Sequence, residues 1–283
     1  MARVLITGSS DGLGVLAARL LVAEGHAVVL HARSRERAGH AAAAVPAAEA
    51  IVVGDFSAID QIHQVADQAN QLGRFDAVIH NAGVGYRETT RNATVDGLER
   101  VFTVNVLAPY LLTALMLRPD RLVYLSSGLH RAGRPHLEDP QWTARAWDGT
   151  QAYADSKLLD VVLAFGMARR WPAVLANALE PGWVPTKMGG PDAPDDLALA
   201  PVIQAWLAVS ADAAAAVTLD TSIIRRPEQR TRPPCPVSFR TTCFTIALIS
   251  PASRYRCRSG WNSPEHHSPA RGELRPRDIS GVA

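Results

Sequence analysis

The regular alternation of short apolar runs with helical patterns constrains the fold of this chain more than any other feature. The sequence opens with an apolar, β-rich run at residues 2–7, a glycine-rich turn and a helical pattern at residues 12–23. Similar pairs follow, and the last apolar run covers residues 173–179. Continuous apolar runs joined by helices are typical of parallel strands that are buried on both faces. The pattern therefore predicts an α/β fold with a single doubly wound parallel sheet.

The expected bounds of the elements follow from the same pattern. Strands are expected at residues 2–7, 26–31, 50–55, 76–80, 121–127 and 173–179. Helical patterns cover residues 12–23, 34–44, 59–72, about 95–117, and a stretch around Tyr153 that runs to about Arg170. Ser34 is expected to be the N-cap of the second helix, because a serine side chain at that position accepts from a free backbone N–H group. The predicted domain spans residues 1–222.

Between the first strand and the first helix lies the turn T-G-S-S-D-G-L-G at residues 7–14. Its glycines let the backbone approach a pyrophosphate closely, and the N-terminus of the following helix then faces the negative charge. At the first strand–helix turn of an alternating pattern, this trio predicts a Rossmann-type dinucleotide site; a tight turn without a ligand is the alternative. The turn residues expected at the dinucleotide are Thr7, Gly8, Ser10, Gly12, Leu13 and Gly14.

The end of the second strand indicates which dinucleotide binds. A carboxylate there would hold the adenosine ribose of NAD, but the sequence reads L-H-A-R-S and has no acid. Arg33 would pair with the 2′-phosphate of NADP, so NADP is the predicted cofactor and NAD remains the alternative. A solvated arginine is the other interpretation of Arg33, and the negative charge of Asp11 in the glycine turn weighs against a phosphate.

The stretch Q-A-Y-A-D-S-K-L-L-D at residues 151–160 carries a tyrosine and a lysine four positions apart. On a helix, Tyr153 and Lys157 share one face. One interpretation is a surface pair in which the ring folds over the lysine stem. The other is chemical: the lysine charge favours the ionised phenol, so that the tyrosine can pass a proton near neutral pH. The glycine turn and the pair Ser126-Ser127 favour the chemical interpretation.

Seven short motifs, in order along the chain, resemble those of the short-chain dehydrogenase/reductase family. They are T-G-S-S-D-G-L-G at 7–14, G-D-F-S at 54–57, H-N-A-G at 80–83, V-N-V at 104–106, Y-L-S-S-G at 124–128, Y-A-D-S-K at 153–157 and P-G-W-V-P-T at 181–186. The resemblance runs from Arg3 to about Met188, roughly two-thirds of the chain. The long stretch between the serine pair and Tyr153 resembles the insert of retinol-dehydrogenase-like members.

The resemblance implies a catalytic tetrad of Asn105, Ser127, Tyr153 and Lys157. Ser127 is preferred to Ser126 because the second serine of the pair matches the catalytic serine of the family. The resemblance gives each residue a role. The tyrosine is the general acid/base, the lysine holds the nicotinamide ribose, the serine binds the substrate oxygen, and the asparagine holds a water in the proton path.

Further cofactor contacts are implied by the same resemblance. Asp55 is expected at the adenine, and Tyr153 and Lys157 are expected to contact the cofactor as well as the substrate. The loop expected on the adenine-ribose side consists of Asn81, Ala82 and Gly83. The segment expected beside the nicotinamide contributes Pro181, Gly182, Val184 and Thr186.

These features predict an NADP(H)-dependent oxidoreductase that interconverts the carbonyl and alcohol forms of a small-molecule substrate. The long insert favours a bulky apolar substrate. The alternative is a non-catalytic or inactivated dinucleotide-binding protein that serves as a regulator or scaffold. Relatives commonly pair through the helix that carries the tyrosine, so a homodimer or a homotetramer is compatible with the resemblance.

Composition and charge argue against other classes of partner. The chain has 283 residues and a net charge of +2, and no apolar run is long enough to span a bilayer, so neither a membrane nor a nucleic-acid partner is expected. The N-terminus leads directly into a strand, which indicates a cytoplasmic protein. The cysteines, Cys235, Cys243 and Cys257, fit no zinc spacing, and no metal site is expected.

The composition changes sharply after about Thr221. Residues 225–283 hold eleven arginines, eight prolines, four acidic residues and no lysine, for a net charge of +7. Because such a segment cannot bury a core, residues 223–283 are expected to be a disordered tail or a segment translated out of the ancestral frame. A basic arm for nucleic acid or membrane is the alternative, but the tail has no clustered lysines.

Overall fold

The computed structural model describes residues 1–211, so the predicted boundary at residue 222 and the tail at 223–283 lie outside the described residues. Within residues 1–211, six strands form one sheet in the order β3-β2-β1-β4-β5-β6, and all neighbouring pairs are parallel. The strands are β1 (Arg3–Ile6), β2 (Ala27–Ala32), β3 (Ala50–Val53), β4 (Ala77–His80), β5 (Arg121–Leu125) and β6 (Leu175–Leu179). The α/β class and the doubly wound parallel sheet are thus confirmed.

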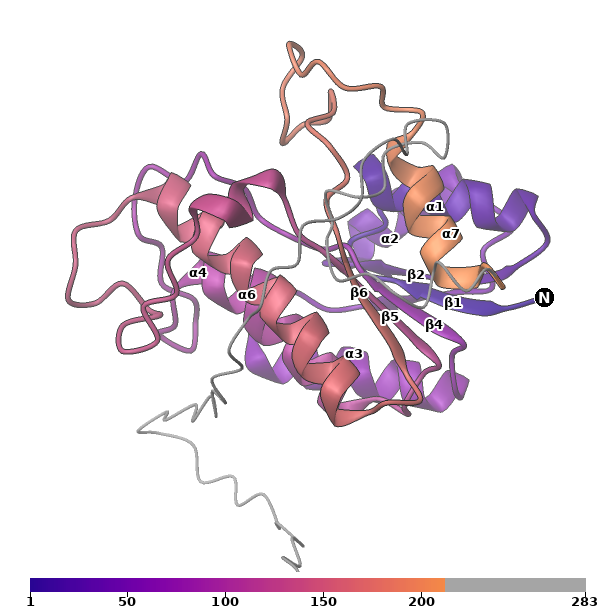
Figure 1. The fold of residues 1–283 in the computed structure, drawn as a ribbon. Helices are drawn as coiled ribbons and strands as arrows, with labels where there is room; N and C mark the ends of the chain where they lie inside the picture. The colour runs from indigo at the N-terminus through magenta and orange to yellow at the C-terminus, as the bar shows by residue number, and fades with distance from the viewer. Residues whose placement is uncertain (212–283) are drawn as a thin grey trace, which may run out of the picture. The chain divides into compact units, whose positions relative to one another are not determined.

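Helices cover both faces of this sheet (Figure 1). One face carries α1 (Gly12–Ala23), α2 (Arg35–Ala44) and α7 (Ala200–Val209). The opposite face carries α3 (Ile59–Leu72), α5 (Ala108–Leu115) and the long α6 (Gly149–Arg170). A short 3₁₀ helix, η2 (Gly128–Ala132), follows β5 and packs against α6.

Both faces of the sheet are apolar, which explains the continuous apolar runs in the sequence. In β1, Val4 and Ile6 belong to the core that α1 and α7 cover, whereas Leu5 belongs to the core that α3, α5 and α6 cover. All three side chains are fully buried. A strand that faces solvent on one side would instead alternate between apolar and polar residues.

Local signals place most helix ends where the sequence predicted them. The side chain of Ser34 accepts from the backbone N–H of Arg37 at 3.2 Å, so the predicted N-cap of α2 is confirmed. Helix α3 ends at Gly73, whose φ of +98° lies in the left-handed region that glycine adopts without strain.

The helix predicted over residues 95–117 begins later than expected. Residues 94–98 form a turn in which the N–H of Leu98 bonds to the hydroxyl of Thr94 and Gly97 has a φ of +75°. Helix α4 (Arg100–Phe102) follows this turn, continues through the π-helical turn η1 (Thr103–Leu107), and leads into α5. The glycine interrupts the helical backbone, so the prediction that the helix begins at residue 95 was wrong.

The π-helical turn has a local physical cause. Pro109 lies four residues after Asn105 and has no N–H to donate to the Asn105 carbonyl, as an α-helix would require. A shift of the hydrogen-bond ladder by one residue accommodates this gap, and such π turns often mark functional positions. The turn contains Asn105, one of the predicted site residues.

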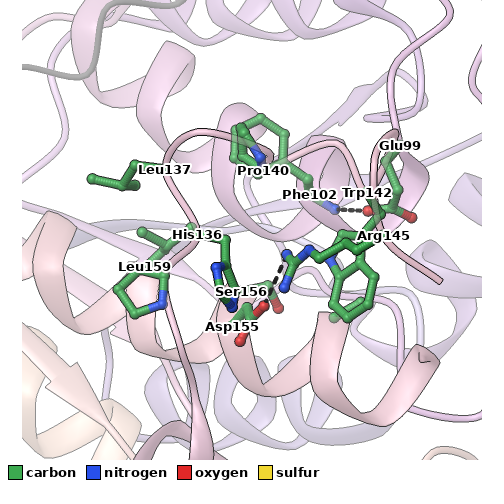
Figure 2. Close-up of a pocket in the computed structure, with 12 residues that line it drawn as sticks. Glu99, Phe102, His136, Leu137, Pro140, Trp142, Arg145, Asp155, Ser156 and Leu159 are labelled. Atoms are coloured by element: carbon green, nitrogen blue, oxygen red, sulfur yellow. Dashed lines mark hydrogen bonds and ion pairs between the residues drawn. The ribbon is translucent and has the colours of Figure 1, made fainter. Parts of the chain in front are cut away.

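The start of this helix is fixed by a buried carboxylate. Glu99 is fully enclosed, and its two oxygens accept from the N–H groups of Val101 and Phe102, both at 2.7 Å (Figure 2). Burial raises the pKa of Glu99, although these two hydrogen bonds oppose the shift. The cap satisfies backbone groups that would otherwise be buried without a partner.

Replacing Glu99 with alanine is expected to lower the free energy of unfolding by about 1–3 kcal/mol, because two buried N–H groups lose their acceptors. Urea unfolding at neutral pH measures the effect. The matched control is Glu24→Ala at an exposed position, expected to change stability by no more than about 0.5 kcal/mol. Equal effects of the two substitutions would show that the cap contributes nothing.

Candidate active site

The candidate site is a cleft of about 850 Å³ at the carboxyl ends of the strands. Residues one or two positions after the strands line it, among them Gly8 after β1, Asn81 after β4 and Ser126 after β5. The strand order reverses between β1 and β4, and ligands of open α/β sheets bind at such a switch point. The cleft therefore lies where the glycine turn predicted a dinucleotide.

The glycine turn approaches the loop after β4 very closely. A Cβ atom added to Gly8 would lie 2.7 Å from the Cα atom of Ala82, and one added to Gly14 would lie 2.6 Å from Nδ2 of Asn81. The side-chain amide of Asn81 donates to the carbonyls of Thr7 and Gly8 at 2.8 and 3.0 Å. These two glycines are therefore required by packing, and the predicted residues Thr7 and Asn81 connect the two loops.

Gly12 has a different role from Gly8 and Gly14, the other two glycines of the turn. It lines the cleft with a φ of +57°, and a Cβ atom there would meet nothing within 4 Å. Asp11, which precedes α1, gives no side-chain hydrogen bond to the first turn of this helix. The N-terminus of α1 thus offers backbone N–H groups beside open space, which fits the pyrophosphate of a dinucleotide.

His31 connects the glycine turn to the loop after β3. Its Nδ1 atom accepts from the N–H of Gly8 at 2.9 Å, so its Nε2–H donates to the carbonyl of Gly54 at 2.8 Å. The ring stacks on Phe56 with 4.1 Å between centroids. Burial lowers the pKa of His31 to about 4, which keeps the ring neutral and its Nδ1 atom available as an acceptor. Sequence reasoning missed this residue; the one signal was a histidine inside an apolar strand.

Two arginines and an aspartate occupy the end of the cleft near β2. The predicted Arg33 is exposed and lines the cleft, as does Arg37, which the sequence analysis missed. Arg37 forms an ion pair with Asp11 at 2.6 Å and donates to the hydroxyl of Ser10 at 3.1 Å. Lys187 pairs with the same carboxylate at 2.8 Å. The negative charge of Asp11 is therefore balanced by two cations.

The protonation of Asp11 follows from these contacts. Partial burial acts to raise its pKa, but the Lys187 ammonium and the Arg37 guanidinium lower it more, so the net shift is downward.

Asp55, predicted at the adenine, also lines the cleft, and its carboxylate accepts from the N–H and hydroxyl of Ser57 at 2.9 and 2.8 Å.

Tyr153 and Lys157 are buried in the cleft and are not a surface pair. Their exposed fractions are 7% and 5%, and both line the cleft. The Lys157 Nζ atom lies 5.6 Å from the centroid of the Tyr153 ring. It donates to the carbonyl of Leu125 at 2.7 Å and to the carboxylate of Asp160 at 2.8 Å. The surface-pair interpretation of the two residues is thus wrong.

The two serines after β5 differ in their surroundings. Ser126 is buried, lines the cleft, and donates its hydroxyl to the Lys157 carbonyl at 2.7 Å. The predicted Ser127 is half-buried, does not belong to the cleft lining, and accepts from the N–H of Leu129 at the start of η2.

Asn105 lies behind the cleft wall. Its Oδ1 atom accepts from the N–H of Val84 at 2.8 Å, and its Nδ2 atom donates to the Val84 carbonyl and to the hydroxyl of Ser156. A Cβ atom on Gly83 would lie 3.4 Å from this Oδ1 atom and 3.7 Å from the Nζ atom of Lys157. The asparagine and the lysine therefore border the same short stretch of loop.

The predicted site residues as a whole divide into two groups. Those that line the cleft are Gly8, Ser10, Gly12, Leu13, Arg33, Asp55, Asn81, Ala82, Gly83, Tyr153, Lys157, Pro181 and Thr186. Those outside the lining are Thr7, Gly14, Asn105, Ser127, Gly182 and Val184. Members of the second group contact other parts of the chain: Asn105 accepts from the N–H of Val84, and a Cβ atom on Gly182 would lie 2.9 Å from the Asp195 carboxylate.

Comparison with known proteins gives the family. The family model described as short chain dehydrogenase matches residues 2–134. An uncharacterized oxidoreductase of Emericella nidulans, AN7799, is 48% identical over 200 residues, which cover 70% of this chain and 76% of that protein. The chain belongs to the short-chain dehydrogenase family.

Two further relatives of this short-chain dehydrogenase are informative. The putative daunorubicin C-13 ketoreductase DnrU of Streptomyces sp. (strain C5) is 34% identical over 66% of this chain and 67% of that protein. A blue fluorescent protein from a metagenomic library, solved in complex with NADPH, has a TM-score of 0.60 and 26% identity. The match covers 73% of this chain and 90% of that one. The chain is thus an oxidoreductase of a fold that binds a nicotinamide cofactor.

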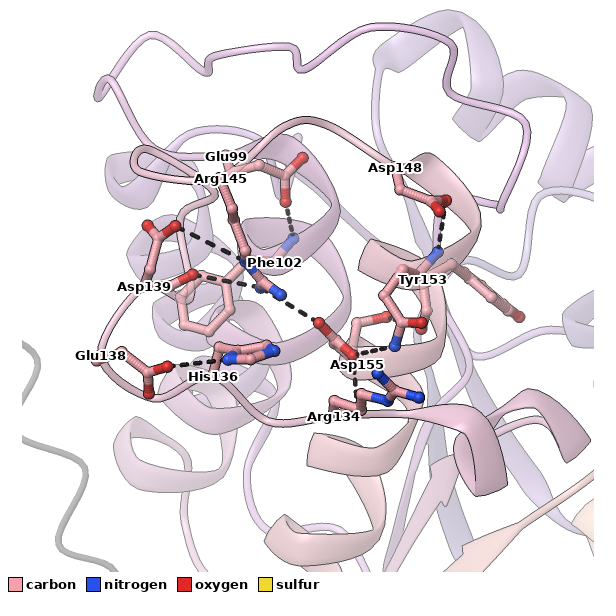
Figure 3. Close-up of polar contacts among 12 residues, drawn as sticks. Glu99, Phe102, Arg134, His136, Glu138, Asp139, Arg145, Asp148, Tyr153 and Asp155 are labelled. Carbon is pink, nitrogen blue, oxygen red and sulfur yellow. Dashed lines mark hydrogen bonds and ion pairs between the residues drawn. The ribbon is translucent and has the colours of Figure 1, made fainter.

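The insert of this short-chain dehydrogenase, residues 128–148, folds against α6 through charged side chains (Figure 3). Arg145 pairs with Asp139 and Asp155 and lies 3.6 Å from the ring centroid of Trp142. The cavity beside them has a volume of about 20 Å³, room for about one water molecule (Figure 2). We regard this region as an anchor for the insert, since it is too small for a substrate.

Among residues 1–211, no helix combines the length and the apolar character that crossing a bilayer requires.

The neutral state of His31 predicts an acid-sensitive fold. Its pKa of about 4 in the folded state lies below its ordinary value of 6.5, so the unfolded chain binds more protons between these values and stability falls as the pH falls through this window. Between pH 7 and pH 5 the loss assigned to this residue is about 2 kcal/mol. Urea unfolding at both pH values measures it.

His31→Gln should reduce the acid-induced loss of stability by about this amount, whereas His63→Gln, at an exposed position of α3, should leave it unchanged. The buried His80, whose pKa burial lowers to about 3, remains in both variants and contributes equally to each. An unchanged loss in the His31 variant would contradict the assignment.

Proposed function

We propose that this chain is an NADP(H)-preferring oxidoreductase that interconverts a carbonyl and an alcohol by hydride transfer, with Tyr153 as the general acid/base. The observation that carries the proposal is the burial of Tyr153 beside Lys157 in the cleft that begins at the glycine turn. The relative named as a putative ketoreductase supports the carbonyl chemistry, and the structure solved with NADPH supports the cofactor.

The residues of the cleft fit a dinucleotide along its whole length. The N-terminus of α1 at Gly12 would hold the pyrophosphate, and Arg33 and Arg37 would hold the 2′-phosphate on the adenosine side. Lys157 would donate to the nicotinamide ribose, beside Thr186 at the nicotinamide end. When bound, the nicotinamide ring supplies the hydride to the carbonyl carbon or accepts it from the alcohol.

The phenol of Tyr153 moves the proton in this proposal. During reduction, negative charge develops on the substrate oxygen, and the Tyr153 hydroxyl donates its proton to that oxygen. The phenol oxygen then carries negative charge, which the nearby Lys157 ammonium stabilises, and both side chains are largely buried. In the oxidation direction the same two groups act in reverse.

Ser127 and Asn105 have supporting roles in the proposal. The hydroxyl oxygen of Ser127 accepts from Leu129, which leaves its O–H free to donate to the developing charge on the substrate oxygen. Asn105 uses its amide to hold the backbone of Val84 and thereby fixes the loop that faces Lys157. A water held by Asn105 in the proton path remains a prediction from the family resemblance.

The groups above the phenol indicate the class of substrate. The sulfur of Met188 lies 3.9 Å from the Tyr153 hydroxyl, and the ring of Tyr86 packs edge-on at 5.7 Å between centroids. A substrate carbonyl must take the place of the Met188 thioether to reach the phenol. Because methionine is unbranched and adaptable, this wall suits a bulky apolar ketone or aldehyde.

Tyr153→Phe tests the proposed acid/base. Turnover of ketones and aldehydes of increasing size, followed by the loss of reduced nicotinamide absorbance, is expected to fall by roughly 10²–10⁴-fold, because the proton donor is removed. The dissociation constant for NADPH, measured by fluorescence, should change little. Tyr110→Phe on α5 is the matched control with full activity expected. NADPH binding without turnover in the wild-type chain would favour a regulator or scaffold instead.

The cofactor preference has its own test. Arg33→Ala and Arg37→Ala should each weaken NADPH binding by roughly tenfold or more, because each removes a charge-assisted hydrogen bond to the 2′-phosphate. NADH binding should change much less, since NADH lacks this phosphate. Arg74→Ala, outside the cleft lining, is the control. Equal losses for both dinucleotides would contradict the predicted preference for NADP.

A further inference from the structure

A second buried charge lies directly beneath the predicted catalytic pair. Asp160 follows Lys157 by three residues on α6, and only 3% of its surface is exposed. Its Oδ2 atom lies 2.8 Å from the Lys157 Nζ atom, and both side chains are almost completely enclosed. The ammonium therefore donates one of its three N–H groups to Asp160 and a second to the Leu125 carbonyl.

The geometry of the ammonium sets the direction of its last N–H group. The three N–H groups of an ammonium point toward the corners of a tetrahedron. With two of them fixed by acceptors in the protein interior, the third is directed away from both. Lys157 lines the cleft beside Gly83, so this remaining N–H group is available to the cleft.

The carboxylate also determines the charge state of the lysine. Burial alone would lower the pKa of Lys157, but the Asp160 carboxylate and the Tyr153 phenol raise it more, and the net shift is upward. Burial raises the pKa of Asp160 to about 6 despite the neighbouring ammonium. Near neutral pH, both members of the pair are therefore ionised.

The other ionisable groups around Asp160 are neutral near neutral pH. Tyr124 on β5 faces it, and burial raises the pKa of this phenol far above the physiological range, with Asp160 contributing. His80 on β4 stacks on Tyr124 with 4.8 Å between centroids, and burial lowers its pKa to about 3. Removing the Asp160 carboxylate would thus leave the Lys157 ammonium without a charged partner among these groups.

Stability alone does not account for such a pair. Replacing a buried ion pair by apolar residues of similar volume is often neutral or stabilising, because both charges must be desolvated. Removing one partner is costly, because the other charge remains buried without compensation. The pair is therefore better explained by what it does to Lys157 than by a contribution to folding.

We propose that Asp160 is a positioning residue that keeps the Lys157 ammonium charged and directs its free N–H group toward the dinucleotide. The inference rests on the proposed function, because it assigns Lys157 to the nicotinamide ribose. Asp160 itself does not line the cleft and acts through Lys157 alone.

The first experiment measures how the Asp160–Lys157 pair affects thermal stability in the chain without added cofactor. In Asp160→Asn, we expect the pKa of the buried lysine to fall below its unfolded value, because burial lowers it and the carboxylate that opposed this effect is gone. The unfolded chain would then bind more protons, and stability would rise with pH up to about 10. The midpoint temperature of unfolding of Asp160→Asn is thus expected to lie below that of the wild-type chain at pH 7, and the deficit should shrink by pH 9. A deficit that does not change with pH would overturn the proposal.

The second experiment measures NADPH binding by fluorescence between pH 6 and pH 9. Asp160→Asn is expected to bind NADPH at least tenfold more weakly than the wild-type chain at pH 9, because its lysine has lost the proton. Lys157→Met should bind weakly at every pH, and adding Asp160→Asn to it should cause no further loss. A full additional loss in the double variant would show that Asp160 does not act through Lys157, and would overturn the proposal.

Controls separate this inference from a general effect on the fold. Asp155→Asn changes the same residue type on the same helix, at a carboxylate that anchors the insert, and should leave the pH dependence of NADPH binding unchanged. Asp160→Glu keeps the charge and should restore part of the affinity. If Asp160→Asn fails to fold, Lys157→Met/Asp160→Leu should fold again, since no unpaired charge remains; its failure would overturn the proposal.

The two proposals fail in distinguishable ways. A wild-type chain that binds neither NADPH nor NADH contradicts the proposed function, and the present inference with it. A wild-type chain that binds NADPH, together with an Asp160→Asn variant that binds it equally well from pH 6 to pH 9, overturns the role of Asp160 alone.

Discussion

The close approach of the glycine turn to the loop after β4 is the constraint on which the rest of the site depends. The Cα atom of Ala82 occupies the space that a side chain on Gly8 would need. Hydrogen bonds from Asn81 to the carbonyls of the turn hold the two loops at this separation. Because β1 and β4 are neighbours at the switch point, the contact fixes both the N-terminus of α1 and the loop that faces Lys157.

The buried polar groups around the cleft are stabilised in two different ways. His31 stays neutral, and its two nitrogens are satisfied by backbone groups of Gly8 and Gly54. Lys157 keeps its charge, and a carboxylate and a carbonyl compensate it. The first arrangement suits a structural link between loops, since a neutral ring exerts little field on a bound anion. The second suits a site that must stabilise negative charge on a neighbouring oxygen.

The sequence predicted the sheet and the position of the cleft because both depend on local patterns. Apolar runs and glycine spacing are properties of neighbouring residues, and they sufficed to place the strands and the glycine turn at the cleft. The spacing of Tyr153 and Lys157 alone fitted a surface pair equally well, and the glycine turn and the serine pair elsewhere in the chain were needed to predict that the two residues lie in the cleft. The start of the helix before Asn105 was misjudged, because the turn at Gly97 and the cap by Glu99 interrupt an otherwise helical pattern. Hydrophobic periodicity alone does not reveal such a turn or cap, because it reports which face of a helix is apolar and not where the helix begins.

Residues whose role depends on contacts between distant segments were beyond the reach of these patterns. Arg37 meets Ser10 and Asp11 across 26 or more residues, and Lys187 meets Asp11 across 176. His31 in β2 could not be distinguished from an ordinary core residue by sequence, because its role depends on one donor, the N–H of Gly8, and one acceptor, the carbonyl of Gly54. Which of Ser126 and Ser127 lines the cleft likewise depends on the path of the chain after β5: the structure places Ser126 in the lining, whereas the family motif selects Ser127.

Two turns of α6 bring these separate constraints together. Successive residues on a helix point about 100° apart, so one short stretch can contact several neighbours at once. Tyr153 and Lys157 face the cleft, Asp155 binds the insert through Arg145, and Ser156 binds Asn105. A displacement of this stretch would therefore move the phenol, the insert and the loop after β4 together. The precision of the site comes from this shared helix, and the ionised Asp160 at its second turn belongs to the same arrangement.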